Sequence, residues 1–377
     1  MAKNKLSTAA TRRKFLGGAA VAGAATIAMP QVSRAQTVTL KMQSGFGATD
    51  ALNEFGVNYA KQVNEMGGGR LKIDYLNAGA VVKFFSVMDA TSQGVLDGAW
   101  SVPAYWYGKH RAASLFGTGP CYGQTASNFM SWFYYGGGQA LYDELTQQIM
   151  KFNVQGFYAF AMPTQPLGWF KKELKGPDDF KGMKYRTVGL ASNVMQAMGA
   201  AVAQLPGPEI LPAMEKGVIE AFEYNNPTSD MRFGAQDVAK YYYLGSYHQA
   251  SEAIEVVYNK TKWDGLAAEQ RQILKLAAMS SNSDNIWHAW DEYSKDLETL
   301  QSKGIIVKRT QESIFKAQLV AWDKVVTEIS SDPNQGPFIK KVLESQKAFF
   351  KRVAFYNINN EADYKSAWEH YFGPMKV

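Results

Sequence analysis

The first third of the chain alternates between strand-like and helix-like patterns, and this alternation constrains the fold more than any other feature. Apolar residues recur with a period of two at 38–42 and 71–75, and in steps of three and four at 52–66. A second helix is predicted over 82–96 and a short buried strand over 98–102. Because parallel strands are joined through crossover helices, this order predicts a βαβαβ unit of the α/β class.

A second group of strand patterns follows, and the chain then turns helical to its end. Gln165 lies between two prolines, which predicts a crossing from one domain to another. Roughly 340 residues remain after an N-terminal signal, enough for two domains with sizeable cores. The predicted strands are 154–160, 168–170, 183–187, 218–224 and 254–258, and the predicted helix faces are 192–198, 286–300, 314–329 and 339–356.

Arg186 is predicted to lie at the carboxyl end of the strand over 183–187, just before a loop of small residues. In open α/β sheets, ligands bind outside the carboxyl ends of the strands. A guanidinium group at such a position offers two parallel donors that match both oxygens of a carboxylate. The alternative is an exposed arginine in a surface ion pair, which contributes little to stability.

The N-terminal segment, residues 1–35, is predicted to be a twin-arginine export signal. Adjacent arginines in Thr11–Leu16 precede an apolar run over Gly17–Met29 and a small-residue cleavage site at Ser33–Ala35. The segment holds six of the 40 Lys and Arg residues and no acid, so the remainder carries 34 basic and 34 acidic residues. A net charge of zero argues against a nucleic-acid partner, and the signal predicts a periplasmic location.

The sequence contains no recognisable catalytic constellation. Its four histidines are not paired at metal-ligand spacing, and neither a G-x-S-x-G turn nor a phosphate-binding loop is present. Cys121 is the single cysteine, which excludes an intrachain disulfide. These absences favour a binding protein, while a periplasmic enzyme acting on a small carboxylate stays as the alternative.

Several short motifs spread over the chain occur together in one known family. They are Gly69–Ile73, Asn77–Gly79, Phe180–Arg186 and Leu211–Ala221, and then Tyr105–Lys109, Tyr134–Gly138 and Glu223–Tyr224. The first four resemble the solute-binding proteins of tripartite ATP-independent periplasmic (TRAP) transporters, the DctP family. The last three resemble its TakP-like branch, which binds 2-oxo acids and lactate. The resemblance covers essentially the whole chain after the signal.

This resemblance implies a two-domain periplasmic binding protein fold, type II-like, with a cleft between the domains. Domain I would comprise residues 36–163 plus about 252–290, and domain II residues 164–251. A C-terminal helical segment over 291–377 would pack on both domains and offer a possible homodimer contact. The implied function is capture of a small organic acid by domain closure and its delivery to the TRAP membrane permease subunits.

The resemblance also implies the residues of the ligand site. Arg186 would bind the ligand carboxylate, and a Na⁺ or Ca²⁺ ion would bridge ligand and protein. The side chains of Gln165 and Glu223 and the main chain of Tyr224 would hold this ion.

Gln165 and Tyr224 are implied to contact the ligand as well as the ion, and three further residues are implied to contact the ligand, namely Tyr105, Asn225 and Gln249. Two positions depart from the branch, which often has Asn where this chain has Ala161 and has Glu where it has Gln249. Losing one carboxylate lowers the negative charge available to a cation, so a site without metal stays open as an alternative.

Overall fold

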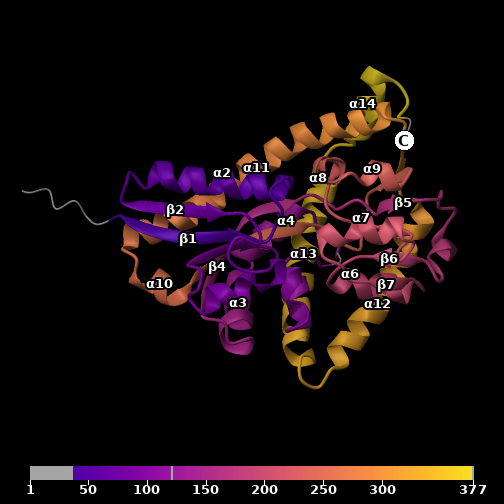
Figure 1. Ribbon diagram of the computed structural model, residues 1–377. Helices are drawn as coiled ribbons and strands as arrows, with labels where there is room; N and C mark the ends of the chain where they lie inside the picture. Colours follow the sequence, from indigo (N-terminus) through magenta and orange to yellow (C-terminus); the bar gives the residue numbers. More distant parts are fainter. Residues whose placement is uncertain (1–36, 120–121, 376–377) are drawn as a thin grey trace, which may run out of the picture. The chain divides into compact units, whose positions relative to one another are not determined.

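Two β-sheets organise the computed structural model, which describes residues 37–119 and 122–375 (Figure 1). The predicted export signal and Cys121 lie outside the described residues. A compact unit begins at Val38. Within the described part of the chain, no helix has both the length and the apolar character that a membrane crossing requires.

The first sheet has the strand order β2-β1-β3-β10-β4. β1 pairs in parallel with β2 and β3, as the βαβαβ pattern predicts, whereas β10 is antiparallel to β3 and β4. The strands are β1 (Val38–Ser44), β2 (Leu71–Leu76), β3 (Gly98–Ser101), β4 (Val154–Met162) and β10 (Glu252–Asn259). The helix predicted over 82–96 is shorter, because it consists of a 3₁₀ turn at Phe84–Ser86 followed by α3 (Val87–Ser92).

Helices cover both faces of this sheet. One face packs against α2 (Ala51–Met66) and the first half of α11 (Ala268–Ser302) around Trp100, Phe160 and Val256. The other face packs on an aromatic core that includes Trp132, Phe133 and Tyr158. The elements on that side are η2 (Pro103–Trp106), η3 (Arg111–Phe116), α4 (Ala126–Tyr135), α5 (Gly138–Asp143), η4 (Glu144–Ile149) and α13 (Gly336–Asn360).

The second sheet has the strand order β11-β9-β5-β8-β6-β7 and lies between two smaller apolar cores. α7 covers one face around Trp169 and Phe222, and α6 and α12 cover the other around Tyr185 and Tyr243. Its strands are β5 (Gly168–Phe170), β6 (Lys184–Arg186), β7 (Ala201–Ala203), β8 (Ala221–Phe222), β9 (Tyr241–Leu244) and β11 (Ile306–Arg309). Its helices and turns are η5 (Pro177–Phe180), α6 (Leu190–Ala197), α7 (Gly207–Glu215), α8 (Pro227–Phe233), α9 (Ala235–Val238) and α12 (Glu312–Ser331).

The chain passes between the two sheets at β4 and β10, which are antiparallel neighbours. Glu252, the first residue of β10, pairs with Met162 at the end of β4. Beyond that point the two segments stay together, because the backbone N–H of Gln165 donates to the carbonyl of Gln249 at 3.2 Å. This side-by-side course places Gln165, Gln249 and Glu252 at the junction of the sheets.

The C-terminal helices bury one face and expose aromatic side chains on another. Val342 and Phe350 of α13 are fully buried in the aromatic core of the first sheet. The end of α13 and α14 (Tyr364–Phe372) instead leave large apolar side chains in solvent, as do Trp287 and Trp290 of α11. The aromatic helix faces predicted from the sequence are therefore core in part only.

Candidate functional site

Arg186 is buried at the carboxyl end of β6, with 3% of its surface exposed. Its Nε donates to the carbonyl of Leu205 at 2.9 Å, and Nη1 donates to the carbonyl and to Oε1 of Glu223 at 2.8 and 3.0 Å. The second terminal nitrogen, Nη2, donates to no residue that the structure describes. The surface ion pair considered as an alternative is therefore wrong for Arg186.

Parallel pairing of β6 with β8 brings the two charged residues together. Arg186 lies opposite Phe222, the residue before Glu223. Glu223 is 1% exposed, and burial raises the pKa of its carboxyl to about 7, although the Arg186 guanidinium acts to lower it. The pair thus combines an arginine whose Nη2 has no described partner with a carboxyl group whose burial raises its pKa to about 7.

Gln165 reaches the same point from the crossing segment. Its Nε2 donates to the Glu223 carboxylate and, at 2.7 Å, to the carbonyl of Tyr224. Its Oε1 is buried and has no hydrogen-bond partner. The three groups implied as metal ligands are therefore in direct contact, and the Gln165 amide fills the space between the two oxygens.

Several other buried polar atoms at the junction lack partners. The side-chain atoms Nε2 and Oε1 of Gln249 make no hydrogen bond, and neither does Oδ1 of Asn225. Buried polar groups are normally satisfied, so a set of unpaired donors and acceptors gathered at one point indicates a place for a ligand, an ion or water.

Tyr105 lies in η2, next to the first sheet, and its hydroxyl lies near the charges of Glu252 and Arg186. Its ring packs against Phe46, Phe84 and Phe85 at centroid distances of 6.1, 5.2 and 5.0 Å. Burial raises the pKa of the Tyr105 hydroxyl well above its usual value, and the nearby charge of Glu252 raises it further. All six residues implied to contact the ligand thus lie at the junction of the sheets.

Two acids of this site were missed by sequence reasoning. Glu252 is 4% exposed, its Oε2 has no partner, and burial together with Glu223 and Asp50 raises the pKa of its carboxyl well above the usual range. Asp50 is 6% exposed and contacts Tyr224 and Asn225. Glu252 could have been found from the sequence, because it is a charged residue at the first position of an apolar strand, 252–259. The sequence around Asp50 predicts only a helix cap.

Within the described residues, hollows lie beside the site, along the crossing segment and at the far ends of the strands of the second sheet. One of about 400 Å³ lies beside the site and is lined by Asp50, Phe84, Tyr224 and Phe233 among others. Another of about 290 Å³ lies along the crossing segment, between Met162–Pro166 and Trp290 of α11. A third lies at the ends of β5, β6 and β8 that are opposite to the end where Arg186 lies.

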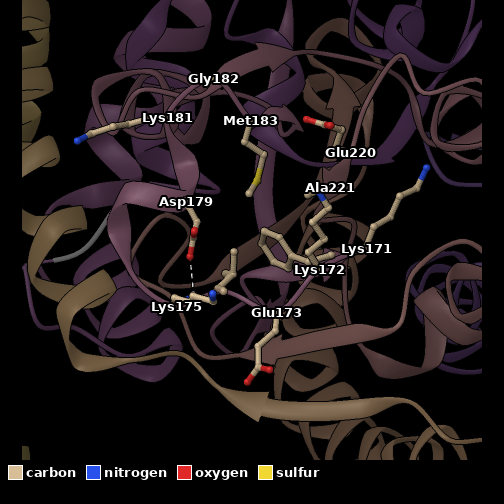
Figure 2. A pocket seen from close by; sticks show the side chains of 12 residues that line it. Lys171, Lys172, Glu173, Lys175, Asp179, Lys181, Gly182, Met183, Glu220 and Ala221 are labelled. Atoms are coloured by element: carbon tan, nitrogen blue, oxygen red, sulfur yellow. Dashed lines mark hydrogen bonds between the residues drawn. The ribbon is translucent and has the colours of Figure 1, made fainter.

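The hollow in Figure 2 has a volume of about 620 Å³ and lies where β5 ends and where β6 and β8 begin, away from Arg186. Lys171, Lys181 and Glu173 on its rim point away from one another (Figure 2). None of its lining residues carries a buried polar atom without a partner, in contrast to the residues around Arg186.

A possible metal-binding cluster lies outside the site. Ligand atoms of Glu54, His288 and Glu292 lie within 4.8 Å of one another. Arg232 already pairs with Glu54 at 3.0 Å and with Glu292 at 3.5 Å. Because a guanidinium supplies the positive charge that these acids require, the cluster is explained as an ion-pair network.

Comparison with known proteins decides the family. The family described as bacterial extracellular solute-binding protein, family 7 (DctP), matches residues 47–332. A monocarboxylate 2-oxoacid-binding periplasmic protein of Nostoc is 32% identical over 94% of this chain and 98% of its own length. The chain belongs to the DctP family. This confirms the predicted solute-binding protein, and the family and its relatives are not enzymes.

Solved structures of TRAP solute-binding proteins share the fold. One from Bordetella bronchiseptica has a TM-score of 0.81 and 25% identity over 89% of this chain and 97% of its own. It is a dimer of mixed occupancy, with copurified calcium and picolinate in one site. Another from Pseudoalteromonas atlantica, with bound sodium and pyruvate, has a TM-score of 0.78 and 27% identity over 90% of this chain and 100% of its own. The predicted α/β binding-protein fold is confirmed.

Proposed function

We propose that the protein captures a small 2-oxo monocarboxylate, of the pyruvate or lactate type, and delivers it to TRAP membrane permease subunits. The observation that carries this proposal is the buried carboxyl group of Glu223, which contacts both Arg186 and Gln165, with buried polar atoms of Gln165 and Asn225 left without partners. The Nostoc relative is named for 2-oxo acids, and the Pseudoalteromonas structure holds pyruvate. Both fit a site built around one buried guanidinium.

The ligand carboxylate would bind to Arg186. Nη2 is the nitrogen with no described partner, so it can donate to a carboxylate oxygen without breaking an existing hydrogen bond. Nη1 donates to Glu223. If it were released from Glu223, Nη1 and Nη2 would together donate to both oxygens of the ligand carboxylate, the geometry that a carboxylate favours. Tyr105, Asn225 and Gln249 would surround the rest of the ligand.

A Na⁺ or Ca²⁺ ion would bind between Gln165, Glu223 and the carbonyl of Tyr224. Hard cations prefer such oxygen ligands. The unpaired Oε1 of Gln165 fits this role, because turning the amide would direct an oxygen where Nε2 now donates to two oxygens. Glu252 supplies a further buried carboxyl, and a bound cation would favour its ionised form over the neutral form that burial favours.

Closure of two domains would enclose the ligand. The proposed domains are residues 36–163 with about 252–290, and residues 164–251, joined at the crossing segments near Gln165 and Gln249. A carboxylate gives up its water only where buried donors replace it, so the ligand favours the closed form in which these groups converge.

The proposed setting is the periplasm, reached by twin-arginine export, with a homodimer formed through the C-terminal helices over 291–377. The exposed aromatic side chains of α13 and α14 support the dimer. Replacing Arg12 and Arg13 together by Lys should leave precursor in the cytoplasm, and normal periplasmic amounts would contradict the export proposal.

A thermal-shift screen followed by calorimetric titration tests the function. The screen uses pyruvate, lactate, longer 2-oxo acids and dicarboxylates, each with and without chelator in sodium-free buffer. A 2-oxo monocarboxylate should raise the melting temperature most, and metal removal should reduce that shift. If no carboxylate binds, the proposed function is wrong. If binding is unchanged without metal and in Glu223→Gln, the metal proposal alone is wrong.

A further inference from the structure

Asp50 accepts more hydrogen bonds than a helix cap requires. It caps α2 by accepting from the backbone N–H of Leu52 at 2.9 Å. Three side chains from distant positions donate to the same carboxylate, namely the hydroxyl of Tyr224 at 2.7 Å, Oγ of Ser229 at 2.9 Å and Nδ2 of Asn225 at 3.3 Å. Four donors therefore converge on one buried carboxyl group.

The acceptor and its distant donors belong to different sheets. α2 packs on the first sheet, whereas Tyr224 follows β8 of the second sheet and Ser229 lies in α8. Ser229 Oγ also accepts from the backbone N–H of Ala51 at 3.3 Å. One helical turn further along both helices, Arg232 of α8 donates to Glu54 of α2 at 3.0 Å. These contacts join the start of α2 to α8.

Tyr224 links this junction to the ligand site. Its carbonyl accepts from Gln165, and its ring lies 5.9 Å from the Arg186 guanidinium. Its hydroxyl points the other way, to Asp50. A change in how Asp50 holds the hydroxyl therefore reaches the carbonyl that we propose as a metal ligand.

We infer that Asp50 is a positioning residue for ligand capture, because it gathers Tyr224, Asn225 and Ser229 when the two sheets close on the ligand. The inference rests on the proposed function, in which closure encloses a carboxylate. Asp50 acts through Tyr224 and Asn225 and not by contact with the ligand. Since these bonds join the two sheets that would close on the ligand, their loss should speed ligand release and leave ligand arrival unchanged.

Two substitutions separate this role from helix capping. Asp50→Asn keeps an oxygen for the Leu52 N–H but replaces the acceptor facing Tyr224 and Asn225 by a donor. Tyr224→Phe removes the hydroxyl and leaves the cap intact. For pyruvate, or the best ligand of the screen, Asp50→Asn should raise Kd roughly tenfold, about 1.4 kcal/mol, through a faster koff. The double variant should be no weaker than Asp50→Asn alone, because both changes remove the same bond.

Stopped-flow binding and ligand-free melting curves give the readouts. Asp332→Asn is the matched control, since Asp332 accepts from the backbone N–H groups of Asn334 and Gln335 in the loop between α12 and α13. It should bind like the parent.

Other results would contradict either the role of Asp50 or the proposed function, and the two cases can be told apart. Parent-like koff in Asp50→Asn, with binding lost in Arg186→Ala, refutes the role of Asp50 and leaves the proposed function standing. If Asp50→Asn melts far below the parent without ligand, Tyr224→Phe decides, and a parent-like koff there refutes the inference. A parent protein that binds no carboxylate overturns the proposed function and this inference together.

Discussion

At the scale of single residues, Arg186 and Glu223 form a pair whose members have separable roles. Arg186→Ala should weaken carboxylate binding by about 2–5 kcal/mol, roughly 30-fold to several thousand-fold, and Arg186→Lys should weaken it less. Arg186→Ala should also lower the melting temperature, since it leaves a buried carboxylate unpaired. Adding Glu223→Gln should restore stability and not binding. Calorimetric titration and melting curves check both results, and binding within about threefold of the parent in Arg186→Ala would contradict the proposed role.

The second prediction for single residues concerns how the stability of the protein depends on pH. Burial raises the carboxyl pKa of Glu223, Asp230 and Glu255 to about 7 each, from ordinary values near 4. At a pH between the unfolded and the folded pKa, these carboxyl groups are protonated in the folded protein and ionised in the unfolded chain. The free energy of unfolding should therefore fall as pH rises from about 4.5 to 7. The ligand-free melting temperature should therefore be lower at pH 8 than at pH 5, and Glu255→Gln should flatten the trend. A melting temperature that rises over this range would contradict the prediction.

At the scale of elements, the turn between β6 and α6 fixes where Arg186 ends its strand. Gly189 has φ +60°, and an added Cβ would lie 2.3 Å from Oγ of Ser114. Gly189→Ala should therefore destabilise the protein by more than the roughly 1–2 kcal/mol of backbone strain alone, and weaken binding. Gly182→Ala is the matched control, because Gly182 has φ +74° with open space around it. Equal melting temperatures for the two variants would show that the contact with Ser114 is unimportant.

The same scale shows how far the sequence predicts the site. Periodicity located β1, β2 and β6 and placed Arg186 at a strand end, because a period of two is a local property. The partner of Arg186 depended on the parallel register that sets it opposite Phe222, which no local pattern encodes. For Glu252 the sequence does offer a local signal, a charge at the start of an apolar strand, but its place beside the site follows from the course of β10 beside β4. The family resemblance supplied Gln165 and Glu223, which periodicity could not.

At the scale of the whole molecule, the proposed homodimer depends on the C-terminal helices. Phe355 and Ile358 are each 69% exposed, and Tyr371 and Phe372 are more than 70% exposed. Large apolar side chains left in solvent favour a protein–protein contact, which supports the proposal. Light scattering should give a dimer for the parent and a monomer for Phe355→Glu combined with Ile358→Glu, with unchanged carboxylate affinity in the monomer. A monomeric parent would contradict the dimer, and Asn360→Glu, nearby and polar, is the control.

The hollow beside the crossing segment provides an optical signal of capture. Trp290 lines it together with Met162–Pro166 and is 61% exposed, as is Trp287 one turn earlier at 64%. Trp100, Trp106, Trp132 and Trp169 are fully buried, so iodide should quench the two indoles of α11 and spare those four. If the sheets close on the ligand as proposed, the crossing segment beside Trp290 should move, and ligand addition should change the quenching of Trp290. Iodide quenching of the native chain would thus follow the proposed closure without an attached dye.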